Sequence, residues 1–209
     1  MKTLRRLGLV SIPLTFSLAG IGMLWLLQVE QAPGSFFEQL GQHRTNWWGA
    51  HLLLLLSTVF LVPAALSIRL ALRSKIVGAL GTAMIIIIAL TAVLLAGQYA
   101  IDFVMPLLIE VGGDALQVHG LLFKTPVIDR LFYKLPNLVF LALFLLSCTL
   151  LGLKHIPWSV RTILLVNWLL VLLGNLIHPV FQRVAIVLLA FSFLPFVYMY
   201  WNKSAQDVE

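Results

Sequence analysis

Residues 76–97 read IVGALGTAMIIIIALTAVLLAG, an apolar run that contains no charged side chain. An α-helix needs about 20 predominantly apolar residues to cross the roughly 30 Å hydrocarbon layer of a bilayer. The stretch is long enough to do so. We therefore expect residues 76–97 to form a membrane-spanning helix.

Other stretches of the chain have the same character and predict an all-α integral membrane protein, a bundle of six transmembrane helices in contact with the lipid bilayer. Of the 209 residues, 61% are apolar and 11% are charged, which is under half of the roughly 25% usual in soluble domains. Only short breaks separate most of the apolar stretches, so we expect a single domain over residues 1–209. The expected spans are residues 7–27, 47–68, 76–97, 135–153, 158–175 and 179–201.

The lysine and arginine residues between the spans predict the orientation, because such residues gather on the cytoplasmic side. An N-in/C-in arrangement places nine of them in the cytoplasm and five outside, which favours this topology. The N-terminal segment Met1–Arg6 is basic, and the apolar run after it is longer than the core of a signal peptide. We therefore expect an uncleaved first span. We expect a multi-pass protein of a cell membrane, the bacterial inner membrane. The nine basic residues expected in the cytoplasm are Lys2, Arg5, Arg6, Arg69, Arg73, Lys75, Lys154, Arg161 and Lys203. The five expected outside are Arg44, Lys124, Arg130, Lys134 and Arg183.

The distribution of charge and the cysteine content exclude some classes of protein. The net charge of +6 is spread over the ends of the apolar stretches rather than clustered on a soluble arm, which argues against a nucleic-acid partner. Cys148 is the single cysteine, so neither a disulfide within the chain nor a zinc site built on cysteines is possible.

The longest connection, residues 98–134, lies between the third and fourth spans on the outer side. Its first part, residues 99–111, is expected to prolong the third helix until Gly112 and Gly113 end it. From Leu121 to Lys134 apolar and charged residues alternate, which predicts an amphipathic segment in the membrane interface. Pro126 should divide this segment into two short parts. Long connections in compact proteins are often functional. We therefore expect a functional site on the outer face.

Five polar side chains are expected to line a vestibule at that face. Gln98 and Asp102 are four residues apart and share one helical face near the outer mouth. His51 lies about one turn into the second span, His119 lies in the long outer connection, and His178 precedes Pro179 at the start of the sixth span. A structural alternative for Asp102 is an interfacial carboxylate, solvated or paired with Arg44 or Arg183.

Imidazole is the commonest metal ligand in proteins and can also hold haem iron. His51 and His178 are candidate ligands for a metal or for haem b if the second and sixth helices are neighbours. However, the sequence contains no pair of histidines at metal-ligand spacing on one helix, as in H-E-x-x-H. For each histidine taken alone, a hydrogen-bonded role in a polar vestibule is the commoner one.

The sequence leaves three functions open, because it lacks a nucleotide-binding loop and a serine-hydrolase elbow. The first is binding of a small amphipathic ligand, a lipid headgroup or a cofactor such as haem b in the outer vestibule. The second is an accessory subunit of a larger membrane complex or a homo-oligomer, for which Gly78 and Gly81 offer a small-residue contact face. The third is a metal-dependent membrane hydrolase that uses the outer histidines and Asp102.

Overall fold

The computed structural model describes residues 2–72, 75–111, 114–153 and 156–206, and within these ranges all the regular structure is helical. The described residues contain six helical segments that are long and apolar enough to cross a membrane, one at each predicted span. The long helices are α1 (Lys2–Glu30), α3 (Arg44–Leu70), α4 (Lys75–Glu110), α7 (Leu138–Leu151), α8 (Trp158–Ile177) and α9 (Pro179–Gln206).

Short helices fill the two long connections that were expected on the outer side. Between α1 and α3 lies α2 (Phe36–Gln42), and after α4 comes α5 (Ala115–Lys124). Three short turns then lead into α7: α6 (Pro126–Ile128), the π-helical η1 (Asp129–Lys134) and η2 (Leu135–Asn137).

The predicted break at Pro126 is confirmed, because α5 ends at Lys124 and Pro126 opens α6. A proline tolerates the first turn of a helix, where its missing N–H is not needed. The third helix continues past residue 97 to Glu110, as expected for residues 99–111. One boundary differs from the sequence prediction: the apolar stretch of the fourth segment begins at Pro126 rather than at residue 135.

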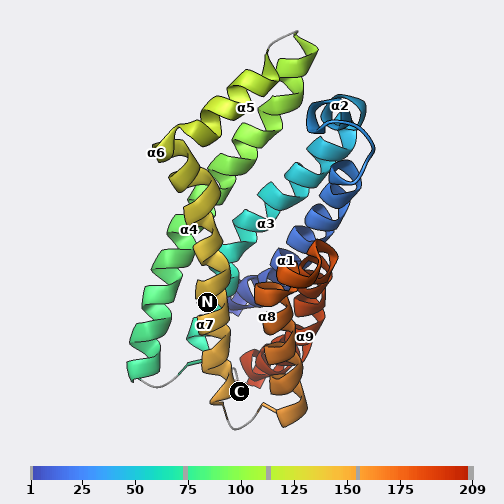
Figure 1. The fold of residues 1–209 in the computed structure, drawn as a ribbon. Helices are drawn as coiled ribbons and strands as arrows, with labels where there is room; N and C mark the ends of the chain where they lie inside the picture. The colour runs from blue at the N-terminus through green and yellow to red at the C-terminus, as the bar shows by residue number, and fades with distance from the viewer. Residues whose placement is uncertain (1, 73–74, 112–113, 154–155, 207–209) are drawn as a thin grey trace.

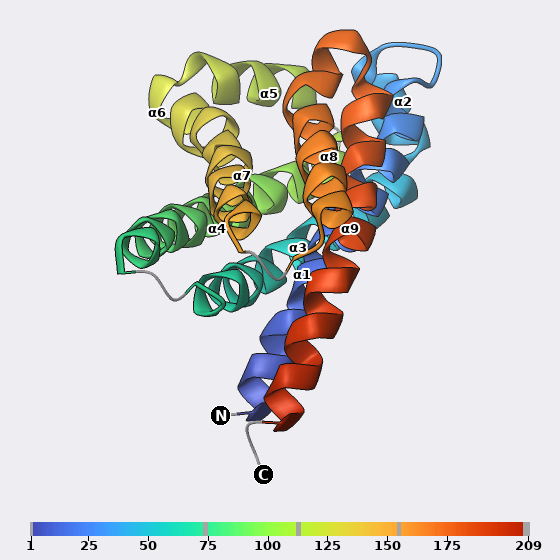
Figure 2. The same ribbon diagram turned by 90° about the horizontal axis from the view of Figure 1, so that it is seen from below.

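The helices pack around α1, which lies between α3 and α9 along its length (Figures 1 and 2). Helix α8 packs on α9, α4 packs on α3, and α7 packs on α4. Figure 2 shows α1 and α9 side by side, with both termini at the same end of the molecule. The second and sixth predicted spans, α3 and α9, are therefore separated by the first.

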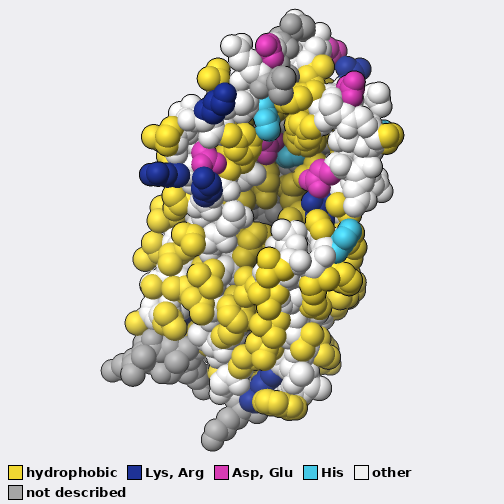
Figure 3. Space-filling view, in the orientation of Figure 1, with side chains coloured by type: hydrophobic (Ala, Val, Ile, Leu, Met, Phe, Trp, Pro, Cys, Tyr) yellow, Lys and Arg dark blue, Asp and Glu magenta, His cyan; other side chains and the backbone are white. Residues whose placement is uncertain are grey.

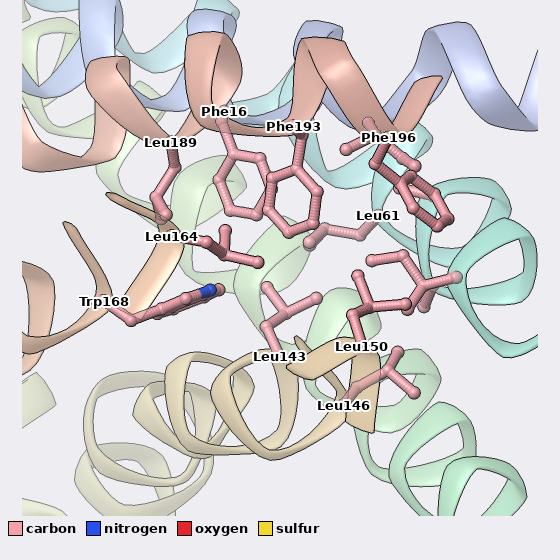
Figure 4. Packing of buried hydrophobic residues seen from close by; sticks show 14 of the residues in the cluster. Phe16, Leu61, Leu143, Leu146, Leu150, Leu164, Trp168, Leu189, Phe193 and Phe196 are labelled. Atoms are coloured by element: carbon pink, nitrogen blue, oxygen red, sulfur yellow. The ribbon is translucent and has the colours of Figure 1, made fainter. Parts of the chain in front are cut away.

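An aromatic cluster holds the centre of the bundle together (Figure 4). Phe16 of α1 stacks on Phe193 of α9, with ring centroids 5.4 Å apart, and meets the edge of Trp168 of α8 at 5.8 Å. All three side chains are buried. Because lipid tails are as apolar as these rings, the cluster stabilises the bundle through close packing rather than through exclusion of water.

The outer surface of the helices is apolar over most of the molecule. Figure 3 shows hydrophobic side chains over the lower part of this face, while charged groups and histidines gather toward the upper end, where α2 and α5 lie. Many large apolar side chains point outward within the spans, including Val93, Phe191 and Ile163. Lipid suits such a surface, and the chain has the structure of a multi-pass membrane protein.

Candidate functional site

Two tryptophans of α3 hydrogen-bond to the backbone of α4 just before a proline in that helix. Pro106 lies four residues after Asp102 and has no N–H, so the helix leaves the Asp102 carbonyl without its usual donor. The Trp47 indole N–H donates to this carbonyl oxygen at 2.8 Å. The adjacent Trp48 indole donates to the carbonyl of Phe103 at 3.1 Å. These two hydrogen bonds dock α3 on α4 at the level of Asp102.

His51 follows Trp47 by one helical turn and is almost completely buried, with 2% of its surface exposed. Its Nδ1 atom lies 2.8 Å from the Trp47 carbonyl oxygen, and its ring lies against the Trp47 indole at a centroid distance of 4.2 Å. A carbonyl oxygen can only accept a hydrogen bond, so Nδ1 carries a proton. The other ring nitrogen, Nε2, points toward α4 and lies 3.7 Å from Oδ2 of Asp102.

The second oxygen of Asp102 is held by the η1 turn. The Tyr133 hydroxyl donates to Oδ1 at 3.0 Å. Gly97 allows η1 to approach this closely, because a Cβ atom at that position would lie 2.5 Å from Cε1 of Phe132. Tyr99, also on α4, meets the His51 ring with its edge at a centroid distance of 6.2 Å. Three elements thus surround the carboxylate.

The two side chains face each other across α3 and α4. With Nδ1 protonated, a neutral imidazole presents the lone pair of Nε2 to a carboxylate oxygen, and two acceptors repel each other. A proton on Nε2 or on the carboxyl group would make the contact attractive. The separation of 3.7 Å is longer than a hydrogen bond.

Aromatic side chains of α2 and α5 lie beyond this pair. His119 of α5 lies 5.5 Å from the Phe36 ring and 4.7 Å from the Phe123 ring, measured between centroids. Phe36 in turn meets Trp47 at 5.7 Å, and Phe123 meets Tyr133 at 4.5 Å.

A capping box fixes the start of α2 and so the position of Phe36. The Ser35 backbone N–H donates to Oε2 of Glu38 at 2.7 Å, and the Glu38 N–H donates to the Ser35 hydroxyl. The backbone hydrogen bond, aided by a second one from the Ser35 hydroxyl, lowers the pKa of Glu38.

These contacts close into a ring that five elements build: α2, α3, α4, α5 and η1. We call it the vestibule ring; polar groups form one side of it and aromatic groups the other. Figure 3 shows a hollow in the upper part of this face, with histidine and acidic side chains along its walls. In order of contact the members are His51, Trp47, Phe36, His119, Phe123, Tyr133 and Asp102.

The structure brings together three of the five predicted site residues, His51, Asp102 and His119. Gln98 is half-buried one turn before Asp102 and is not a member of the ring. His178 lies elsewhere: it is exposed, and its Nδ1 accepts the Val180 N–H at 3.3 Å, which caps the start of α9. Because α1 separates α3 from α9, the condition for a joint site of His51 and His178 is not met.

The two arginines considered as partners of Asp102 are engaged with other carboxylates. Arg44 pairs with Glu110 at 3.2 Å, and Arg183 pairs with Glu30 at 2.6 Å. Arg183 also donates to the carbonyl of Met23 and so ties α9 to α1. Asp102 is therefore held by a histidine and a tyrosine. Among the described residues there is no group of three or more histidine, cysteine or acidic side chains placed to hold a metal.

Comparison with protein families, curated proteins and solved structures finds no match to this chain.

Sequence analysis missed the aromatic members of the ring. Trp47 opens the second predicted span and was given no role in the site, and Tyr133 lies in the predicted amphipathic segment, also without a role. One signal was present for Trp47, because it lies four residues before His51 and thus on the same helical face. Tyr133 is 31 residues from Asp102, and no local pattern connects them.

A second hollow, of about 270 Å³, lies between α8 and α9. Its lining is mainly apolar, and the side chains of Asn167 and Ser192 hydrogen-bond each other at 2.5 Å. Because it lies within the apolar spans, a lipid acyl chain suits it better than a polar ligand. The vestibule ring is therefore the stronger candidate site.

Proposed function

We propose that this chain is a membrane-embedded binding protein whose outer vestibule receives a small amphipathic ligand. The observation that carries the proposal is the closed vestibule ring. His51, Asp102 and Tyr133 offer hydrogen bonds and charge, while Phe36 and Phe123 offer apolar faces. Ligand sites in proteins combine an apolar lining with a few placed polar groups in the same way.

The geometry favours a small ligand over haem b. An axial histidine needs a free ring nitrogen, and Nε2 of His51 faces the Asp102 carboxylate at 3.7 Å. Iron could bind there only if this carboxylate moved away. A metal-dependent hydrolase is also less well supported, because His178 caps α9 and is not available as a metal ligand beside His51.

The small-residue face gives little support to an accessory role. The space above Gly78 and Gly81 is filled by Arg69 of the same chain: Cβ atoms at these glycines would lie 2.8 Å from Nη2 and 2.5 Å from Cδ of Arg69. The Arg69 Nε–H also donates to the hydroxyl of Thr82 at 3.3 Å. These glycines therefore serve packing within the chain.

The proposal includes the N-in/C-in orientation, which opens the vestibule to the outside of a bacterial inner membrane. The excess of basic residues at the opposite end supports it. In this orientation the segment from α5 to η1 lies in the outer interface. Leu121 and Val127 on this segment are exposed and can enter the lipid, and Lys124 and Arg130 can reach headgroups.

Two measurements test the orientation. A Gln117→Cys variant, made in a Cys148→Ser background, should react with a membrane-impermeant maleimide in intact spheroplasts. A reporter enzyme that is active only in the periplasm, fused after Glu209, should stay inactive. The opposite result in either experiment would overturn the orientation.

Ligand binding can be tested with three probes that share one apolar body: 3-phenylpropylamine, 3-phenylpropanol and 3-phenylpropionate. At least one should raise the melting temperature of the purified protein, and Phe123→Ala should abolish the effect. Phe181→Ala is the matched control, because Phe181 is exposed on α9, far along the chain from the ring, and lines neither hollow. If none of the three probes binds, the proposed function is wrong.

A further inference from the structure

We propose that the ligand is an organic cation, an amine with an apolar body, and that it enters in exchange for the proton held between His51 and Asp102. This inference rests on the proposed function, since it names the ligand class of the same vestibule ring.

The charge of the ring favours a cation. Asp102 is its only acidic member, no ring member is a lysine or arginine, and the Asp102 side chain is 16% exposed. Three basic groups of this end of the molecule pair with other carboxylates: Arg44 with Glu110, Arg183 with Glu30 and Lys134 with Asp129. Lys124 and Arg130 are exposed at the surface of α5 and η1. We therefore expect the positive charge beside Asp102 to come from a proton on His51 or from a ligand. Anionic ligands would face this carboxylate directly.

The aromatic members favour an amine with an apolar body over a metal ion. A continuous series of ring contacts beside the carboxylate runs through Trp47, Phe36, His119, Phe123 and Tyr133. An ammonium group is attracted to the faces of such rings, and its hydrocarbon part packs against them. A metal ion would require more ligands than the single histidine and single carboxylate that face each other here.

The exchange balances in atoms and charge. In this exchange Nε2 of His51 carries a proton before binding and faces Oδ2 of Asp102, which lies 3.7 Å away. The protonated amine then donates one N–H to Oδ2 and a second N–H to Nε2, which requires the lone pair of Nε2. The proton of Nε2 leaves to water, so one cation enters and one leaves. Nδ1 keeps its proton on the Trp47 carbonyl throughout.

The hydrogen bonds of the surrounding groups do not involve the two exchanging atoms. The groups that face the pair are Tyr133 of η1, Tyr99 of α4 and Trp47 of α3. The Tyr133 hydroxyl donates to the other carboxylate oxygen, and the Trp47 indole donates to a backbone carbonyl. Neither hydrogen bond uses Nε2 or Oδ2, so both persist when the amine replaces the proton.

Isothermal titration calorimetry of the purified protein tests the inference, with 3-phenylpropylamine titrated in phosphate and in Tris buffer. The difference between the two apparent enthalpies gives the number of protons released. We expect one proton per amine bound, and an affinity that rises up to tenfold per pH unit while His51 is protonated. 3-Phenylpropanol and 3-phenylpropionate should bind at least tenfold more weakly and release none.

Three variants separate the roles. Asp102→Asn should remove the preference for the amine over the alcohol. His51→Gln keeps a hydrogen-bonding side chain but has no titrating group, so it should bind the amine without releasing a proton. This variant tests the exchange even if the Asp102 variant does not fold. The double variant Arg44→Gln/Glu110→Gln is the control, because it removes an ion pair at the same end of α4 outside the ring without releasing an unpaired charge, and it should behave as the unchanged protein.

The outcomes distinguish this inference from the proposed function. If the alcohol or the carboxylate binds as tightly as the amine, the cation preference is wrong and the binding function stands. If the amine binds without proton release from the unchanged protein, the exchange is wrong. If no probe binds at all, the binding function itself fails.

Discussion

Nε2 of His51 lies 3.7 Å from Oδ2 of Asp102, while Nδ1 of the same ring lies 2.8 Å from the Trp47 carbonyl. The first contact joins α3 to α4, and the second ties the imidazole to the backbone of its own helix. These two contacts within the protein therefore set the orientation of the imidazole. Trp47 contributes twice, because its carbonyl holds His51 and its indole holds the backbone of Asp102.

The role of Trp47 beside Pro106 can be tested with a double-mutant cycle. Trp47→Phe should lower the free energy of unfolding by about 1–3 kcal/mol, because the carbonyl of Asp102 loses its donor. In a Pro106→Ala background the same change should cost less, since the new N–H of residue 106 can donate to this carbonyl within the helix. Unfolding in mixed micelles with SDS provides the measurement.

The control for this cycle is Trp158→Phe, because Trp158 is exposed at the start of α8. It should leave the free energy of unfolding almost unchanged in both backgrounds. Equal costs of Trp47→Phe with and without Pro106 would show that the indole does not replace the missing helical hydrogen bond.

Tyr133→Phe removes the hydroxyl that donates to Oδ1 of Asp102 and leaves the ring in place. Hydrogen bonds to charged groups contribute about 1.5–3 kcal/mol, so we expect a loss of free energy of unfolding in this range. Tyr198→Phe removes the same atom from an exposed position on α9 and should have little effect. If the two variants lose equal stability, the hydroxyl of Tyr133 makes no specific contribution.

Gly97 and Gly120 form a matched pair for testing how η1 is seated. Leucine at residue 97 would push Phe132 away from α4, and overpacking of this kind costs about 1–3 kcal/mol. At Gly120 a Cβ atom meets nothing within 4 Å, so leucine there should be tolerated and should favour the helix. We expect Gly97→Leu, unlike Gly120→Leu, also to weaken amine binding, because Tyr133 moves with Phe132. Unchanged binding by Gly97→Leu would contradict this coupling.

The positions of the six spans could be predicted from sequence because each is long and apolar, and hydrocarbon forces such segments into helices. The continuation of the third helix past Gln98 and Asp102 was also predicted, and α4 ends at Glu110. The start of the fourth span was predicted less well, because charged residues before residue 135 interrupt the apolar pattern but not the helical segment that begins at Pro126. Helix order was not predictable, since nothing local in the sequence shows that α1 lies between α3 and α9.

For the site, sequence reasoning identified the polar residues and missed their partners. A buried histidine or carboxylate is costly in a membrane and therefore conspicuous, which is why His51 and Asp102 were predicted. Aromatic residues are common at membrane interfaces for reasons unrelated to function, so Trp47 gave no distinctive signal. The pairing of Asp102 with Tyr133 depends on how η1 folds back on α4, and this required the structure.

The capping box of α2 predicts that the rim of the vestibule loosens in acid. The Ser35 backbone N–H, together with its hydroxyl, holds the pKa of Glu38 below its ordinary value of 4.5. A carboxylate with a lowered pKa stabilises the folded state fully above the unfolded value and loses this contribution as the pH falls through the folded value. Amides of Phe36–Gln42 should therefore exchange hydrogen faster below about pH 4.5, after correction for intrinsic rates. Glu38→Gln cannot titrate, so its corrected exchange should stay constant over this range. A pH-dependent rate in the unchanged protein and a constant rate in the variant would show that Glu38 causes the loosening. Because α2 carries Phe36, the loosening would then lie at the rim of the vestibule ring. Identical profiles would exclude Glu38 as its cause.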